Sequence, residues 1–374
     1  MNQINELYIG NYRGIKNLRL ENTGAINLLV GRNNAGKTSI LEAIELISAP
    51  GDVYQMVQTA RGRDRSLVTS SSLLTLDSML WAFPVSSGVE ANEQIHSDIV
   101  IELKGFERDI SYKISCEDTK TLVEKYQEIP KVLINDEAEE VEKEFVEARA
   151  LRLIFNINNN GKYYSRREVV TFPSALMRRN SKKPIYNTKM ITPVEHRLIP
   201  VSPKALTDSI LGGNKEKLIQ LLQDFDENIE DIEILSPDDR TAVPYFKHKY
   251  KGYLPVSIYG DGIRRVLTVA TAILQARNGI LLIDEIETAI HAKSLNIFFE
   301  WLVSSCHEFN VQLFATTHSL EAIDGIVSAD SNHLSELIVY RLNKDRDTEE
   351  TKSTRFTGET LHTIRVELGQ DVRG

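Results

Sequence analysis

The chain has 374 residues, of which 41% are hydrophobic and 26% charged, a composition typical of one large globular domain or two ordinary ones. It has no apolar run of about 18 residues that could span a membrane, and its first residues lack a secretory signal, so we expect a cytoplasmic protein. The two cysteines lie far apart, which argues against a disulfide framework or a zinc site. The net charge of −9 would repel nucleic acid unless basic residues cluster locally.

The first 50 residues predict two alternating strands over 4–21, a buried strand over 25–31 and an amphipathic helix from residue 38. Between the buried strand and the helix stands "GRNNAGKT", which fits the pattern G-x-x-x-x-G-K-[ST]. Strand, glycine-rich loop and helix in that order are the context that a phosphate-binding loop requires. The sequence therefore predicts a nucleotide site here.

Each part of this loop has an expected role. The backbone N–H groups and the positive end of the helix would hold the phosphates, Lys37 would contact the β- and γ-phosphates, and Thr38 would ligate Mg²⁺. The predicted ATP-binding residues are Gly31, Asn33, Asn34, Ala35, Gly36, Lys37, Thr38 and Ser39.

Residues 51–254 have a looser pattern. Strand-like pieces include 97–103, 109–115 and 151–164, the last with an Asn-Gly turn, and helices are predicted over 136–147, 203–211 and 215–225. We interpret 51–254 as an inserted β and helical region, packed on a core formed by 1–50 and 255–374.

From residue 260 strands and helices alternate again. The pattern predicts a helix over 261–279 closed by glycine, buried strands over 280–285 and 311–319, a helix between them, and a last strand–helix piece over 360–374. This alternation indicates an α/β fold with a mostly parallel, mixed sheet and flanking helices.

Three further motifs carry chemistry. Asp284 ends a buried strand and would hold Mg²⁺ through a water, Glu285 would orient or deprotonate the attacking water, and His318 would contact the γ-phosphate. The turn "YGDGIRR" opens a helix and offers a second anion-binding start at Gly260, Asp261 and Gly262. A second such turn is expected if it completes the nucleotide site of another subunit.

The four motifs in this order resemble the ABC-type ATPases of the SMC/RecF group, and most closely the OLD-family ATPases without a Toprim domain. "GRNNAGKT" resembles the Walker A motif, "SIYGDGIRR" the signature, "LLIDEIETAIH" the Walker B motif and D-loop, and "FATTHS" the switch histidine. The resemblance implies a P-loop NTPase fold of the ABC/SMC-head type. It also implies a head-to-tail dimer that encloses two ATP, with the signature turn supplied in trans and residues 287–291 near the seam.

Some positions depart from the family pattern or leave alternatives open. Tyr259 stands where the signature usually has the serine that contacts the γ-phosphate, and Ser257 lies two residues earlier. Either the backbone amides of the turn make most of the phosphate contacts, or hydrolysis is slow. Gln55 or Gln58 could supply the family's Q-loop glutamine. The hairpin residues Tyr12 and Arg13 either touch the nucleotide or are structural.

Charged segments could bind partners. Residues 162–197 are rich in Lys, Arg and Tyr, which suits DNA contacts by Arg166, Arg167, Arg178 and Arg179 but equally an ordinary solvated surface. The acidic stretches 136–147 and 224–239 could repel or mimic DNA, dock a basic partner or be solvated.

The leading functional hypothesis is an ATP-hydrolysing sensor or scaffold for a separately encoded effector, a nuclease, in anti-phage defence. The stretch after His318 is too short for a Toprim domain, and no coiled-coil heptads occur. One alternative is a RecF-like DNA-repair ATPase that clamps DNA, and another is an ATP-gated scaffold with little turnover.

Overall fold

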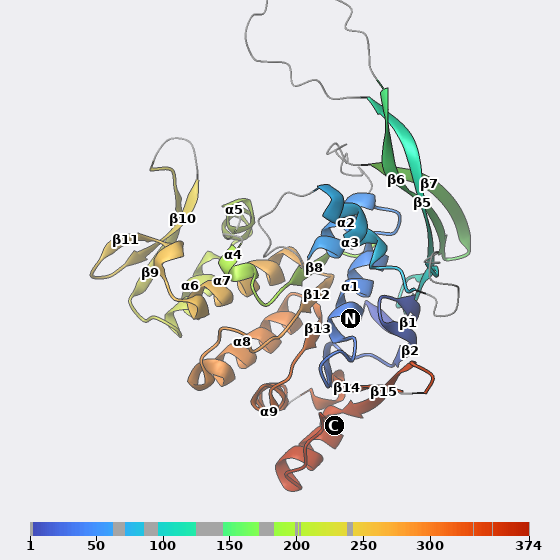
Figure 1. Ribbon diagram of the computed structural model, residues 1–374. Coiled ribbons are helices and arrows are strands. Elements are labelled where there is room, and N and C mark those ends of the chain that lie inside the picture. Colours follow the sequence, from blue (N-terminus) through green and yellow to red (C-terminus); the bar gives the residue numbers. More distant parts are fainter. Residues whose placement is uncertain are drawn as a thin grey trace, which may run out of the picture.

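The computed structural model describes residues 3–62, 72–85, 96–124, 145–171, 183–198, 201, 203–237, 242–331, 333–345 and 347–373. Their strands form three sheets (Figure 1). None of the described helices is long and apolar enough to cross a membrane.

The central sheet has the strand order β15-β14-β3-β13-β12-β8, and all neighbours run parallel except β14 and β15. This confirms the mostly parallel sheet. Its strands are β3 (Ile26–Gly31), β8 (Thr188–Ile191), β12 (Ile280–Ile283), β13 (Gln312–Thr316), β14 (Leu337–Lys344) and β15 (Thr351–Thr357).

Both faces of this sheet are covered at its central strands β3, β13 and β12, whose residues are buried along their whole length. Successive side chains point to opposite faces, so Leu29 joins the core around α1 (Lys37–Ser48), whereas Leu28 and Val30 join the core on the other side. The second core contains α7 (Asp261–Gln275), α8 (Leu295–Glu308) and α9 (Leu320–Ala329).

The second sheet is antiparallel, with the order β2-β1-β4-β5-β6-β7, and it packs on the α1 side of the central sheet. Asn160 (φ 50°) and Gly161 (φ 78°) form the tight turn between β6 and β7 that the Asn-Gly pair predicted. The strands are β1 (Ile4–Tyr12), β2 (Ile15–Glu21), β4 (Ile99–Gly105), β5 (Asp109–Glu124), β6 (Phe145–Asn159) and β7 (Lys162–Thr171).

A third, three-stranded sheet lies beside a group of short helices at the other side of the molecule (Figure 1). It consists of β9 (Ile229–Leu235), β10 (Val243–His248) and β11 (Gly252–Pro255). The remaining helices are α2 (Val53–Arg61), α3 (Ser72–Leu80), α4 (Glu195–Leu198), α5 (Pro203–Leu211), α6 (Lys215–Gln223) and α10 (Gly358–His362).

Some sequence predictions were wrong in detail. The acidic helix over 136–147 lies largely outside the described residues, and its last three residues are the first of β6. Helix α7 ends at Gln275, and the left-handed residue after it is Asn278 (φ 55°) rather than Gly279. Residues 360–373 contain no strand; α10 is followed by a π-helical turn (Thr363–Glu367).

The division into a core and an inserted region stays a prediction, but the strand β8 does not follow it. This strand belongs to the range 51–254 and pairs in parallel with β12 in the central sheet. Its four residues, Thr-Lys-Met-Ile, have neither an alternating nor a continuous apolar pattern, so no local signal predicts that it lies next to a buried strand.

Candidate nucleotide-binding site

The loop between β3 and α1 has a backbone that only glycine tolerates at two positions. Gly31 has φ 141°, and a Cβ there would lie 2.5 Å from the carbonyl oxygen of Leu342. Gly36 has φ 91°, and a Cβ there would lie 2.9 Å from Cγ1 of Ile15. These two contacts explain sterically why the motif has glycine at both ends.

Lys37 bends back over this loop. Its Nζ donates to the carbonyl oxygens of Gly31 (2.8 Å) and Arg32 (3.0 Å), and the residue is only 6% exposed. Burial lowers the pKa of the Lys37 ammonium, against the opposing effect of nearby carboxylates such as Asp284. The charge is thus held inside the loop that the sequence predicts to bind phosphate.

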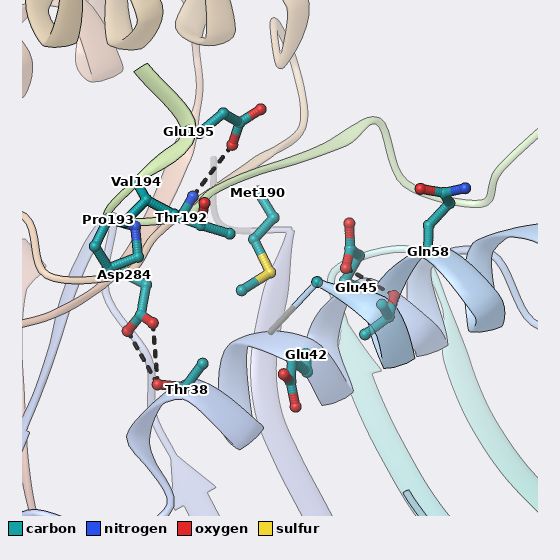
Figure 2. A pocket seen from close by; sticks show the side chains of 12 residues that line it. Thr38, Glu42, Glu45, Gln58, Met190, Thr192, Pro193, Val194, Glu195 and Asp284 are labelled. Atoms are coloured by element: carbon teal, nitrogen blue, oxygen red, sulfur yellow. Dashed lines mark hydrogen bonds between the residues drawn. The ribbon is translucent and has the colours of Figure 1, made fainter. Parts of the chain in front are cut away.

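Thr38 and Asp284 meet beside the loop although they come from different parts of the chain (Figure 2). The Thr38 hydroxyl donates to both carboxylate oxygens, at 3.0 and 3.2 Å. Thr316, at the end of β13, donates to the same carboxylate at 2.6 Å and is itself buried. Because β3, β12 and β13 are adjacent, their carboxyl ends bring these three side chains together.

This donor set fits Mg²⁺. Hydroxyl and carboxylate oxygens are its preferred ligands, and Asp284 is 8% exposed. A pocket of about 300 Å³ opens beside Thr38 and Asp284 and is also lined by the carboxylates of Glu42, Glu45 and Glu195. Several carboxylates in one pocket attract a cation and repel a phosphate.

Of the two candidate Q-loop glutamines, the structure brings one to this pocket. Gln58, on α2, lines it, whereas Gln55 lines a separate pocket with Lys204 and Arg277. Gln58 is therefore the better placed of the two, and its role stays a prediction.

Glu285 lies in a strained turn directly after Asp284, the predicted metal ligand. It has φ 49°, which is uncommon for a residue other than glycine. Its backbone N–H donates to the hydroxyl of Thr316 (2.8 Å), and its Oε2 accepts from the hydroxyl of Thr288 (3.1 Å). Two threonines thus fix the backbone and the carboxylate of this residue.

A buried arginine supports the same turn from α7. Arg265 is fully buried, and its guanidinium donates to the carbonyl oxygens of Asp284 (3.2 Å), Glu285 (3.3 Å) and Thr192 (2.6 Å). Burial lowers its pKa to about 10, so it remains charged at neutral pH. Sequence reasoning missed this residue, although its place four positions before the core residue Val269 was a usable signal.

The loop carrying His318 is held from two sides by its backbone. Its N–H donates to Oε1 of Glu287 (3.0 Å), and its carbonyl oxygen accepts from Nη1 of Arg373 (2.8 Å). The side chain itself is exposed. The predicted histidine therefore projects from a fixed backbone.

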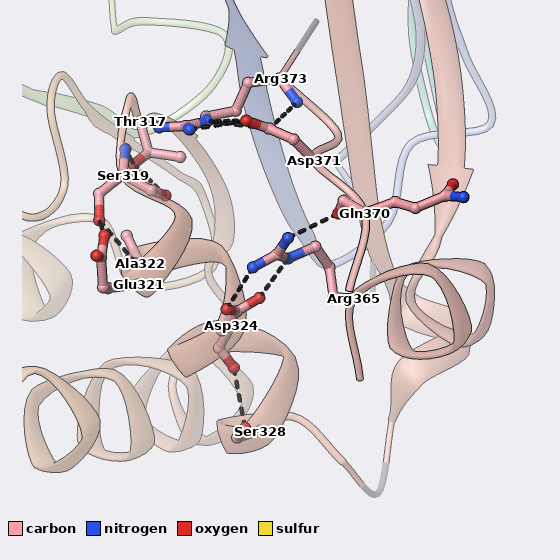
Figure 3. Close-up of polar contacts among 10 residues, drawn as sticks. All are labelled: Thr317, Ser319, Glu321, Ala322, Asp324, Ser328, Arg365, Gln370, Asp371 and Arg373. Atoms are coloured by element: carbon pink, nitrogen blue, oxygen red, sulfur yellow. Dashed lines mark hydrogen bonds and ion pairs between the residues drawn. The ribbon is translucent and has the colours of Figure 1, made fainter. Parts of the chain in front are cut away.

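The C-terminal segment forms this second support (Figure 3). Arg373 also pairs with Asp371 (2.8 Å), and Arg365 makes a two-pronged ion pair with Asp324 of α9, at 2.7 and 2.8 Å. No local sequence pattern links these late residues to the loop after β13. We name the pair Arg365 and Arg373, with their partners, the C-terminal clasp.

The signature turn opens α7 as predicted, with Gly260 as the residue before the helix and Asp261 as its first residue. Among the described residues, the pocket at Thr38 and Asp284 is lined by none of the three turn residues. A Cβ on Gly260 would meet no atom of the described residues within 4 Å apart from its two chain neighbours, whereas one on Gly262 would lie 3.3 Å from the carbonyl oxygen of Ala289.

The side chain of Tyr259, at the position where the signature usually has serine, does not project outward from the turn. Its ring packs edge-on against Phe246, with 4.9 Å between centroids, and its hydroxyl is buried without a hydrogen-bond partner among the described residues. Burial raises the pKa of this phenol. The residue is part of the contact between the turn and the third sheet.

The hairpin residues Tyr12 and Arg13 both contact Glu42. Nε of Arg13 lies 2.7 Å from Oε2 of Glu42, and the Tyr12 hydroxyl donates to the same oxygen at 3.3 Å. Glu42 is 2% exposed, so the arginine compensates a buried charge. These contacts are those expected of structural residues.

The predicted DNA-contacting residues are only partly described. Arg166 is partly buried and pairs with Glu168, while Arg167 is exposed on β7. Tyr163 and Tyr164, on the same strand, are 74% and 52% exposed. Arg178 and Arg179 lie outside the described residues.

Comparisons with known proteins agree with this geometry. A family model described as "AAA domain, putative AbiEii toxin, Type IV TA system" matches residues 26–324. An "ATP/GTP phosphatase" of Helicobacter pylori is 23% identical over 352 residues, 86% of each chain. The "DNA replication and repair protein RecF" of Clostridioides difficile is 46% identical over 46 residues, 12% of each chain.

A solved structure shares the fold. The crystal structure of an Smc head bound to the C-winged helix domain of ScpA superposes with a TM-score of 0.50, over 96% of this chain and 99% of that one, at 10% identity. The fold is thus that of ABC-type P-loop ATPases such as the SMC head. The predicted SMC/RecF-like ATPase fold is confirmed.

Proposed function

We propose that this chain, which belongs to the AAA-domain family described above for AbiEii-type toxins, binds ATP with Mg²⁺ and hydrolyses it. One observation carries the proposal: Thr38, Asp284 and Thr316 form a single hydrogen-bonded group at the carboxyl ends of three adjacent parallel strands, directly beside the glycine-rich loop. The name of the Helicobacter relative supports the same chemistry.

In this proposal the residues divide the work. The loop amides and Lys37 bind the phosphates, while Thr38 and Asp284 hold Mg²⁺, which would neutralise phosphate charge when bound. Glu285 accepts the proton of the water that attacks the γ-phosphorus, and ADP leaves. Thr288 orients the Glu285 carboxylate, and His318 contacts the γ-phosphate.

The working unit in this proposal is a head-to-tail dimer. The turn at Gly260, Asp261 and Gly262 would contact the nucleotide held by the other subunit. Gly260 supports this, because the space around its Cα is open and can admit a phosphate from outside. Arg197 supports it too, since it pairs with Asp261 (2.7 Å) and so offsets the negative charge of the carboxylate within that turn.

The output is proposed to lie in a separate effector, a nuclease in anti-phage defence. The family description, with its toxin–antitoxin setting, supports an ATPase that works with another protein. The alternative of a RecF-like DNA clamp is favoured by the short stretch of RecF similarity and by the exposed Tyr163, Tyr164 and Arg167. The alternative of a slow, ATP-gated scaffold is favoured by the tyrosine at position 259.

The test is ATP-dependent dimerisation of Glu285→Gln, measured by light scattering. This variant keeps the phosphate and metal contacts but cannot accept the proton, so ATP should convert it to a stable dimer while phosphate release falls by about 10²- to 10⁴-fold. Lys37→Ala should stay monomeric in the presence of ATP, because it lacks the lysine that binds the phosphates. Glu300→Gln, an exposed carboxylate on α8, is the matched control and should behave as wild type. Wild-type turnover by Glu285→Gln would contradict the assignment of the base.

A further inference from the structure

Two histidines and a buried aspartate gather at the edge of the central sheet opposite the nucleotide loop. His307 lies in the last turn of α8, Asp330 directly follows α9, and His333 precedes the 3-10 turn Leu334–Glu336 that leads into β14. These segments lie at the starts of β13 and β14, whereas the nucleotide loop and Asp284 follow the ends of β3 and β12. The cluster is therefore separate from the site described above.

The distances within this cluster suit a shared metal ion. Nε2 of His307 lies 3.2 Å and Nδ1 of His333 lies 3.4 Å from the same oxygen, Oδ1 of Asp330. Ligands bound tetrahedrally at about 2.0–2.1 Å stand about 3.3 Å apart. One ligand atom from each residue falls within 4.8 Å of the others, so a small rotation of the exposed His333 side chain closes the set.

The aspartate has a charge that the protein alone leaves partly uncompensated. Asp330 is 1% exposed, and its Oδ2 is buried without a hydrogen-bond partner among the described residues. A buried carboxylate with an unsatisfied oxygen is costly unless a cation lies beside it. This orphaned oxygen is a second observation, independent of the spacing, that points to a cation here.

Glu336 lies near the second ring nitrogen of His307, at a distance longer than a hydrogen bond. Its Oε2 lies 4.0 Å from Nδ1 of His307, on the side of the ring away from Asp330. Histidines that bind a metal through one ring nitrogen usually donate the other N–H to a carboxylate or carbonyl, which fixes the ring and its tautomer. The order Asp330, His307, Glu336 follows that arrangement.

We propose that His307, Asp330 and His333 bind one divalent transition-metal ion, with zinc as the first candidate. Imidazole nitrogens favour zinc and its neighbours over Mg²⁺ or Ca²⁺. The exposed fraction of the two histidines, 26% and 54%, leaves one coordination position to water. The ion ties the ends of α8 and α9 to the start of β14, and neither cysteine is required. The competing explanation is a plain ion pair between a charged His307 and Asp330.

The test measures metal binding by the full chain after dialysis against a chelator. Wild type should take up one Zn²⁺ per chain in the presence of millimolar Mg²⁺, and Co²⁺ should give the visible bands of a low-coordinate site. His333→Gln removes an exposed ligand with little risk to folding and should weaken Zn²⁺ affinity by at least about 10- to 100-fold. His362→Gln, an exposed histidine on α10, should bind as wild type.

Glu336→Gln should lower the Zn²⁺ affinity by a smaller factor, about 10-fold, because it weakens a partner of a ligand and removes no ligand. Absence of stoichiometric Zn²⁺ or Co²⁺ uptake by wild type would overturn the proposal in favour of the ion pair. Equal affinity in wild type, His307→Gln and His333→Gln would overturn it as well, because the metal would then sit elsewhere. Nucleotide turnover plays no part in either result.

Discussion

The hydroxyl of Thr38 and the carboxylate of Asp284 are hydrogen-bonded at 3.0 and 3.2 Å although 246 positions separate them in the chain. The contact joins the start of α1 to the end of β12 and defines where Mg²⁺ would be held. The rest of the proposed chemistry is arranged around this pair.

Asp284→Asn should therefore keep the fold and lose metal affinity. The amide can still accept from Thr38 and Thr316, but it lacks the charge that holds a divalent cation. Loss of several kcal/mol of charge stabilisation predicts phosphate release lowered by roughly 100-fold or more, with partial recovery at high Mg²⁺. Titrating activity against Mg²⁺ checks this. Asp208→Asn, an exposed partner of Lys204, is the control, and an unchanged Mg²⁺ dependence of Asp284→Asn would argue against the metal assignment.

Arg373→Ala tests whether the C-terminal clasp positions the loop of His318. Removing the donor to the His318 carbonyl frees one side of that loop, so we expect the turnover number to fall while ATP affinity changes little. Global stability should change by less than about 1 kcal/mol, because Arg373 and Asp371 form a surface pair. Arg152→Ala, which breaks another exposed pair on β6, is the control. If the C-terminal clasp has only a structural role, Arg373→Ala should lower the free energy of unfolding, and the turnover number should not fall separately from the ATP affinity.

Arg167→Glu tests the DNA hypothesis on the described part of the basic segment. Arg167 is exposed on β7, on the same face of the strand as Tyr163, whereas Arg166 is already paired with Glu168. If this face binds DNA, the charge reversal should weaken binding and reduce its salt dependence, with ATPase activity retained. Fluorescence anisotropy with single- and double-stranded DNA over a salt series measures this. Wild type without DNA affinity at low salt would remove the repair alternative.

Stability should decrease in mild acid because of His196. This residue is 5% exposed, both ring nitrogens lack a hydrogen-bond partner within the described part of the chain, and burial together with Arg265 lowers its pKa from 6.5 to about 4. Asp261 opposes that shift, and Arg197 and Arg264 add to it. Between these two pKa values the unfolded chain binds a proton that the folded chain does not, so the free energy of unfolding falls as the pH drops below about 6.5.

The expected loss is about 2 kcal/mol between pH 7.5 and pH 5 for this one group. Urea unfolding of wild type and His196→Leu at both pH values isolates the contribution, since leucine cannot titrate. The variant should lose about 2 kcal/mol less than wild type over that interval. Identical pH dependence in the two proteins would mean that His196 is protonated in the folded state.

The sequence predicted those parts of the molecule that local patterns encode. The apolar strands β3, β12 and β13 and the glycine-rich loop each have a local signal, so their meeting at one sheet edge followed from parallel topology. Contacts that depend on long-range packing had no such signal: Arg373 on the loop of His318, and Glu42 against Arg13.

Short strands were missed for a similar reason. β8 has four residues, and only its pairing with β12 makes it a strand. Arg265 was not among the predicted site residues, whereas in the structure it donates to three backbone carbonyl oxygens in the core. In both cases the structure depends on a tertiary contact that the local sequence does not indicate.

The most direct test of the central claim is complementation between two inactive variants. Lys37→Ala removes the lysine proposed to bind phosphate but keeps the turn. Gly260→Asp places a carboxylate in the turn at a position where a Cβ would meet no described atom within 4 Å beyond the two neighbouring residues. Gly260 is preferable to Gly262, whose substitution would also press on Ala289. Each variant alone should be inactive, and an equal mixture should regain about a quarter of wild-type phosphate release, since half of randomly formed dimers hold one intact site. A mixture as inactive as its parts, with both variants folded, would contradict a nucleotide site shared between two subunits.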